Sequence, residues 1–426
     1  MSLPAEVASN RLNFLSKKRR AVSSVSSRQI IPASNGNSFT LGSTINLDIP
    51  GNQASTFLDF QNSYVRFTLE NNSTEAFNIN SAYSLFQTCE ILADGQTISS
   101  IQNYGAAVSV FLDTEVSEET RARYMALLAG TTGGMGAAIA IGAKQTFCIP
   151  LPLTPLFNSS KYIPVFSRSN LRIRLTLADS TRALSQGVGG DAGGIPNGSV
   201  RLSPVDFVGS FIRLSAPAMA LVNQNTGGRY ELVTIDMRVA EGTIAQGETG
   251  LNQNLGFSFS SLDKIFFGIF PTYNTAKANS TGNRARFHLS EYSVSINGEE
   301  YPRRRITTAA TNLSESVAEM ALATSSLANF QHQTSLTPTQ FGLTNGDGTS
   351  NAQLGKYVAF IDTESMKPHT DDDAIYSGIS TLGATTQLVG SFSQGAPVQA
   401  TLLVFAQYTM SMSLDLNGTG TWVVAV

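Results

Sequence analysis

The chain has 426 residues, of which 42% are hydrophobic and only 14% are charged, and its formal net charge is −3. A chain of this length buries a large core and is expected to divide into two or three domains. It contains no run of ~18 apolar residues, which argues against an integral membrane protein. Neutral polar residues take the place of charges, and such a surface suits large subunit contacts because neutral groups lose their hydration more easily.

The first segment, residues 1–36, is rich in Ser and in basic side chains and is expected to be an extended, unpacked arm. Residues 1–31 contain one acid, Glu6, and six basic residues, which gives them a local charge of +5. The six basic residues are Arg11, Lys17, Lys18, Arg19, Arg20 and Arg28. The run "SKKRR" fits a contact with DNA or an anionic membrane, a nuclear localisation signal, or a solvated tail. Aromatic residues are not interleaved with it, so nothing indicates readout of a base sequence.

From Phe39 onward, short segments with β-branched or aromatic residues alternate with turns. In "LRIRLTL", residues 171–177, apolar and polar side chains alternate strictly, which predicts a half-buried strand. Helical signals are few. One helix is expected between 103 and 129, beginning at Thr114 or Ser117, and another between 312 and 330. Many strands with little helix predict an all-β protein.

Two hairpins with similar patterns stand far apart in the chain. "EILADGQTIS" turns at Asp94-Gly95 and "SVSINGEEYP" turns at Asn297-Gly298, and the two glycines are 203 positions apart. Each is followed by one of the expected helices. This order predicts two similar β domains in tandem, in which Gly95 and Gly298 superpose. The sequence "LVNQNTGGRYELV" contains the expected boundary between them.

We therefore predict two tandem eight-stranded jelly rolls, at residues 37–222 and 223–426, with short inserted helices and long loops. Half-chains of about 200 residues are too long for immunoglobulin-like modules, which have about 100 residues. The Gly-rich segments 184–199 and 344–355 are expected to be two of the long loops.

Three blocks of the sequence carry a resemblance to a known family: "NSAYSLFQTCEILADGQTISSIQNY", "IPLPLTPLFNSSKYIPVFSRSNLRIRLTLAD" and "ATLLVFAQYTMSMSLDLNG". With them, residues 36–426 resemble the double jelly-roll major capsid proteins of tailless double-stranded DNA viruses, of the Polinton-like virus and virophage type. The resemblance implies a structural virion protein, located in the capsid. It also implies homotrimers with a pseudo-hexameric outline, which tile an icosahedral shell around double-stranded DNA.

The resemblance also implies partners. These are neighbouring capsomers, penton proteins and minor or cement proteins. The basic arm is expected to face the interior, where it contacts DNA or an internal membrane without sequence specificity.

The segment "YPRRR" follows the second hairpin and places Arg303, Arg304 and Arg305 on a strand. Consecutive strand residues alternate faces, so we expect these arginines either to lie at a subunit interface or to form an exposed cluster. "HTDDD", residues 369–373, is interpreted as a solvated turn in preference to a calcium loop. No metal ion, cofactor or small-molecule substrate is predicted.

Catalytic motifs are missing from the sequence. His288, His332 and His369 form no H-E-x-x-H pattern, and there is no G-x-S-x-G turn. The chain is therefore predicted not to be an enzyme. The alternative function is a tandem β-sandwich that binds carbohydrate or serves as a spike or fibre, although Trp422, the only tryptophan, lies in an apolar strand.

Overall fold

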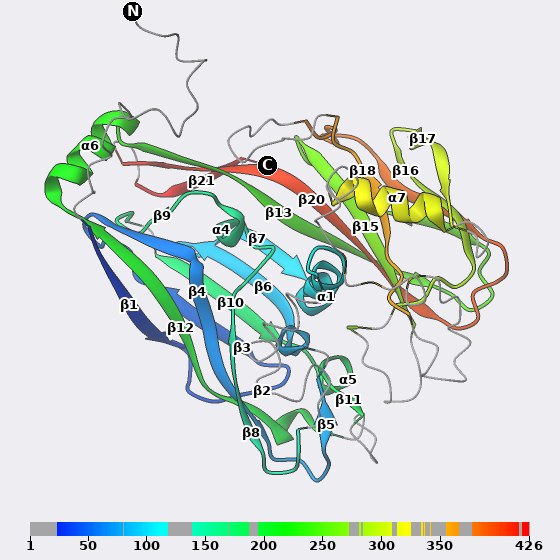
Figure 1. The fold of residues 1–426 in the computed structure, drawn as a ribbon, viewed down its shortest axis with the longest axis horizontal. Coiled ribbons are helices and arrows are strands. Elements are labelled where there is room, and N and C mark those ends of the chain that lie inside the picture. The colour runs from blue at the N-terminus through cyan, green and yellow to red at the C-terminus, as the bar shows by residue number, and fades with distance from the viewer. Residues whose placement is uncertain are drawn as a thin grey trace, which may run out of the picture.

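The structure is a computed structural model, and the residues it describes are 24–79, 81–117, 139–168, 170–186, 195–271, 281–282, 284–308, 313–324, 334, 336, 341, 355–365, 377–416 and 420–425. Long antiparallel strands dominate it, and the chain forms two β-sandwich units that lie side by side (Figure 1). The predicted all-β double jelly roll with short inserted helices is confirmed.

In its described residues the first roll has twelve strands, several of them very short. They are β1 (Ser24–Pro32), β2 (Phe39–Thr40), β3 (Thr44–Ile49), β4 (Thr56–Asn71), β5 (Phe77–Asn78), β6 (Phe86–Ala93), β7 (Gln96–Gln102), β8 (Lys144–Ile149), β9 (Ile163–Pro164), β10 (Leu171–Leu177), β11 (Ser185–Gln186) and β12 (Val200–Leu214). Its helical segments are η1 (Ala82–Leu85), α1 (Tyr104–Thr114), α4 (Pro155–Asn158), α5 (Ser180–Ala183) and η3 (Asn197–Ser199).

Helix α6 (Ala216–Thr226) connects the first roll to the second. The strands of the second roll are β13 (Arg229–Ile244), β14 (Gly250–Asn254), β15 (Leu262–Pro271), β16 (Leu289–Ile296), β17 (Glu299–Thr307), β18 (Ala359–Asp362), β19 (Thr386–Phe392), β20 (Ala400–Asp415) and β21 (Trp422–Ala425). Helix α7 (Ser314–Ala323) follows β17, as α1 follows β7.

The two rolls share one topology. The first has a sheet of order β1-β12-β4-β8 facing a sheet of order β3-β10-β6-β7, and the second has β13-β20-β15-β18 and β14-β19-β16-β17. When the eight main strands of each roll are counted in chain order, both rolls have the strand orders 1-8-3-6 and 2-7-4-5. Each of the eight main strands of the first roll therefore has a defined counterpart in the second, so that β1 corresponds to β13 and β7 to β17, and α1 and α7 occupy corresponding places after β7 and β17.

Alternating apolar residues build the sandwich interiors. In β10 the four apolar residues are buried and the three polar residues between them are half-buried, as the sequence predicts. The buried apolar residues of both rolls form one continuous cluster. Phe166 of the first roll packs edge-on against Tyr230 of the second, with ring centroids 5.2 Å apart, so the core crosses the boundary between the rolls.

One local prediction is wrong. Residues 24–32, expected in an unpacked arm, form β1, which pairs along its whole length with β12. Its residues are mostly exposed, so it lacks the apolar alternation that reveals a strand. The boundary at 222/223 stays a prediction; α6, in which Ala, Met and Leu favour helix, spans this point. Thr114 is the last residue of α1, whose small and apolar residues from Tyr104 onward pack against η1 and β6, and most of the helix predicted to begin at Thr114 or Ser117 lies outside the described residues.

Candidate assembly interface

Of the six basic residues predicted to face the interior, the structure places one. Arg28 lies on β1, exposed, with its guanidinium 6.0 Å from the centroid of the Tyr64 ring. This distance is suited to a cation–π contact. Arg11, Lys17, Lys18, Arg19 and Arg20 lie outside the described residues, and so does the "HTDDD" turn at 369–373.

The three predicted interface arginines lie on β17, which leaves its pairing with β16 at this point. Val294 pairs with Tyr301, and the next ladder pair is Tyr292 with Ile306. The four residues 302–305 therefore form a bulge opposite the single residue between Tyr292 and Val294. Arg305 forms ion pairs with Glu300 at 2.8 Å and Glu291 at 3.0 Å. The Arg305 guanidinium also lowers the pKa of Glu300.

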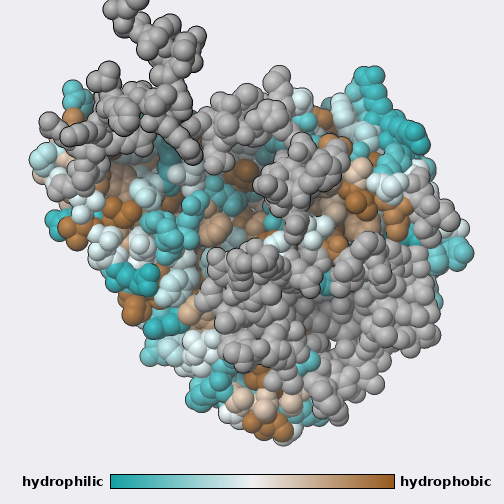
Figure 2. All heavy atoms as spheres, viewed as in Figure 1, coloured by the Kyte–Doolittle hydropathy of each residue, from teal (hydrophilic) through white to brown (hydrophobic). Residues whose placement is uncertain are grey.

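The remaining two arginines of the bulge, Arg303 and Arg304, are exposed. In Figure 2 hydrophilic residues gather at the end of the molecule where the β16–β17 hairpin lies. The role of Arg303, Arg304 and Arg305 at a subunit interface stays a prediction.

The two hairpin turns occupy corresponding places, between β6 and β7 and between β16 and β17. Asp94 and Gly95 have φ of 49° and 82°, and Asn297 and Gly298 have 52° and 86°. Both central residues of each turn are therefore left-handed, as a type I′ turn requires. The superposition of Gly95 on Gly298 stays a prediction, which the shared topology supports.

We expect Gly298→Ala to destabilise the protein by about 1–2 kcal/mol, because a Cβ disfavours the left-handed backbone. A Cβ at this position meets no neighbouring atom, so the loss measures the backbone conformation alone. Gly198→Ala is the matched control, since Gly198 also has open space but no positive φ. Urea unfolding of both variants checks this; equal midpoints would contradict it.

A buried ion-pair cluster joins the two rolls. Asp113, in the last turn of α1, accepts hydrogen bonds from Arg284 at 2.6 Å and from Lys356 at 2.8 Å, both in the second roll. Asp113 and Arg284 have side-chain exposures of 1% and 0%. Close by, Lys264 pairs with Glu115 at 2.9 Å. The carboxylates of the first roll thus meet cations of the second where water is largely excluded.

A second polar contact lies where β7 meets β13. The buried Asp236 carboxylate accepts hydrogen bonds from the Ser99 hydroxyl of the first roll at 2.6 Å and from the Tyr408 hydroxyl at 2.8 Å. Burial raises the pKa of Asp236 to about 6, although both hydroxyl donors act in the opposite direction. These contacts fix the position of one roll against the other.

Sequence reasoning missed these junction residues. Along the chain, Arg284 lies 171 positions after Asp113, and Lys356 lies 243 positions after it. None of the three belongs to a local motif. The available signal was weak: Asp113 is a lone charge that follows the apolar run "AAVSVFL", and a charge in such a place usually has a partner.

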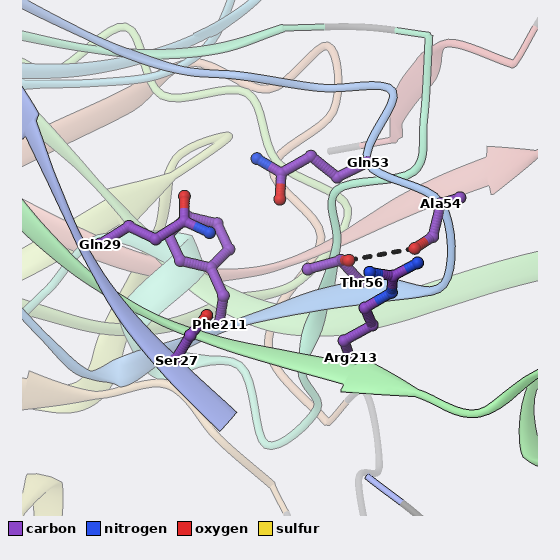
Figure 3. A pocket seen from close by; sticks show the side chains of 7 residues that line it. All are labelled: Ser27, Gln29, Gln53, Ala54, Thr56, Phe211 and Arg213. Carbon is purple, nitrogen blue, oxygen red and sulfur yellow. Dashed lines mark hydrogen bonds between the residues drawn. The ribbon is translucent and has the colours of Figure 1, made fainter. Parts of the chain in front are cut away.

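A pocket lies beside β1, the edge strand of its sheet. Figure 3 shows Ser27 and Gln29 of β1, Phe211 and Arg213 of β12, and the start of β4 converging on it. The remaining lining residues are Gln53, Ala54 and Thr56, and the Thr56 hydroxyl donates to the Ala54 carbonyl at 3.1 Å. Polar and apolar groups both line the pocket, and two of the lining residues, Ser27 and Gln29, lie on the edge strand β1.

Other kinds of site find no support in the described part of the chain. There, no group of three or more His, Cys, Asp or Glu side chains lies close enough to hold a metal ion. No helix in those ranges has the length and apolar character needed to span a membrane. Trp422 is 6% exposed, so its ring does not offer a platform for a sugar.

The sequence matches no known family and no curated protein. Solved structures do match. The chain is similar to the PBCV-1 virus capsid protein, with a TM-score of 0.65, 12% identity, and coverage of 97% of this chain and 99% of that chain. The structure of the Sputnik virophage matches with a TM-score of 0.59 and 11% identity, over 100% of this chain and 93% of that chain. The mavirus major capsid protein matches with a TM-score of 0.53 and 10% identity, over 100% of this chain and 95% of that chain. At these identities the likeness establishes the fold, which is the double jelly roll.

Proposed function

We propose that this chain is the major capsid protein of an icosahedral double-stranded DNA virus. The observation that carries the proposal is the end-to-end match in both directions: 97% of this chain aligns with 99% of the PBCV-1 capsid chain. The chain therefore corresponds to a whole capsid subunit of that kind and not to one shared domain.

The junction between the rolls suits this function. A shell subunit transmits contact forces from one neighbour to another, so its two rolls have to keep a fixed relative position. The buried ion pair of Asp113 with Arg284 and the hydrogen bond from Ser99 to Asp236, together with the shared apolar core, hold the rolls in place. In our proposal three copies form a ring in which six rolls alternate, and the scarcity of charge helps broad surfaces come together.

The proposal includes a role for the basic arm. Arg28 lies in β1, which is paired with β12 of the sheet, and the five other basic residues precede it in the chain. We propose that they face the shell interior and neutralise phosphate groups of DNA or an internal membrane. Penton and cement proteins are proposed partners at other surfaces of the trimer.

Light scattering during size-exclusion chromatography of the full chain tests the function. We expect a particle of three times the chain mass, and electron micrographs of it with a hexagonal outline. A chain that stays monomeric across protein concentration, pH and ionic strength would contradict the proposal. Binding of a glycan without trimer formation would favour the attachment alternative.

A further inference from the structure

The two rolls can be aligned residue by residue through their ladder pairs. Across the first sheet of each roll runs a row of four residues, each paired with the next. In the first roll the row is Ile163, Leu58, Phe211 and Ser27. In the second roll it is Ile379, Leu262, Tyr408 and Asp236. Ser27 is therefore the counterpart of Asp236.

The hairpins give a second alignment. Ile91 and Val294 each stand four residues before the turn glycine of their hairpin, and they pair with Ser99 and Tyr301 respectively. Tyr301 of β17 is therefore the counterpart of Ser99 of β7. Because Ser99 reaches Asp236 at 2.6 Å within one chain, the corresponding pair would be Tyr301 and Ser27.

Tyr301 and Ser27 cannot meet within one chain. β1 lies on the outer side of the first roll and β17 at the far end of the second (Figure 1). The place next to Ser27 is the pocket of Figure 3, whereas the place next to Asp236 is filled by β7. The pocket beside β1 thus corresponds to the place that β7 fills beside β13, but no element of the described chain fills it.

Exposure differs between the counterparts in the way that a missing neighbour predicts. Helix α1, whose last turn is bonded to the second roll through Asp113, is buried almost throughout, but α7 exposes Val317 and Leu322. Phe166, three residues after Ile163, packs on Tyr230, but Leu382, three residues after Ile379, is 59% exposed. Val25 and Ile30 of β1 are 70% and 57% exposed. Apolar groups in such places are typical of an uncovered interface.

We infer that the contact between the two rolls is repeated between chains, so that β17 of one copy docks at the β1 pocket of the next. The inference rests on the proposed capsid function and names the surfaces of its trimer. Head-to-tail contacts of this kind close into a ring. The pocket offers the Ser27 hydroxyl and the side-chain amides of Gln29 and Gln53 to the polar groups of Tyr301 and of the bulge at 302–305 that follows it. Since Arg213 also lines the pocket, Arg303 and Arg304 are expected at its rim, away from this like charge.

Ser27→Arg tests the surface by placing a large cation in the pocket. We expect the dissociation constant of the trimer to rise by about 100-fold or more, because an unpaired charge enters the contact. The matched control is Ile141→Arg, which adds the same charge at a residue that is 61% exposed and precedes β8, the opposite edge of the same sheet. Light scattering across a dilution series gives the constants, and thermal unfolding establishes that both variants are folded.

A cysteine pair tests the contact directly. Ser27→Cys with Tyr301→Cys in one chain should form a disulfide between copies on mild oxidation, since disulfides require Cα atoms within about 7 Å. Non-reducing electrophoresis should show dimers and trimers, which neither single variant gives. The native Cys89 is buried and Cys148 half-buried, so the single variants control for them.

The outcomes separate the two proposals. If trimers form but the cysteine pair stays unlinked and Ser27→Arg remains trimeric, the assignment of surfaces is wrong and the capsid function stands. If the wild-type chain forms no trimer at all, the function itself is contradicted. Trimers that are lost with Ser27→Arg and linked by the cysteine pair support both.

Discussion

Replacement of Asp113 by Ala is expected to lower the free energy of unfolding by about 3–5 kcal/mol, because it leaves the buried Arg284 guanidinium without its carboxylate. Arg284 is fully buried and cannot reach water, whereas Lys356 is partly exposed and can. Chemical unfolding of the full chain, followed by circular dichroism, measures the loss.

The control for Asp113→Ala is Asp48→Ala, which removes the partner of Arg172 at a half-exposed ion pair in the first roll. Exposed pairs contribute about 0–1 kcal/mol, so this variant should stay close to wild type. The double variant Asp113→Leu with Arg284→Met should recover much of the loss, because it removes both buried charges. Equal effects of Asp113→Ala and Asp48→Ala would show that burial at the junction has no energetic weight.

The stability of the protein is expected to depend on pH through Asp236. Its pKa is raised from 3.8 to about 6 in the folded chain, so the folded state holds a proton that the unfolded state has released. The contribution of this group is therefore most favourable below pH ~4 and is lost as the pH rises towards 6. A shift of this size corresponds to about 3 kcal/mol.

Asp236→Asn isolates this contribution. Because Asn does not titrate, the difference in unfolding free energy between wild type and variant should change by about 3 kcal/mol between pH 4 and pH 7. Urea unfolding at several pH values measures the difference, from which effects of other carboxylates cancel. Asp263, whose pKa is also raised to about 6, stays in both proteins and serves as an internal reference. A difference that does not vary with pH would contradict the assignment.

Sequence patterns predicted the fold well wherever a strand has one buried face. The alternation in residues 171–177 matches the burial of β10 residue by residue. The Asp-Gly and Asn-Gly pairs form the turns that the sequence predicts, with positive φ at both residues of each pair. The pattern failed for β1, because an exposed edge strand is held by backbone hydrogen bonds to β12 and needs no apolar face.

The junction could not be predicted for a different reason. An ion pair such as Asp113 with Arg284 depends on how two rolls pack, and neither residue has a neighbour in sequence that indicates its partner. The arginines of β17 were recognisable as a cluster. That Arg305 would be neutralised within its own hairpin, leaving Arg303 and Arg304 exposed, depends on the bulge that the pairing with β16 introduces.

The shared core that joins the rolls has a consequence for the kinetics of ring closure. Each free body that joins an assembly loses translational and rotational entropy, and a covalent link removes that loss for the partners it connects. In a ring of alternating rolls, every second contact already exists within a chain when it folds. Six single-roll subunits would need five encounters to form the proposed ring, whereas three two-roll chains need two, so closed rings are expected at lower protein concentration and with fewer incomplete intermediates.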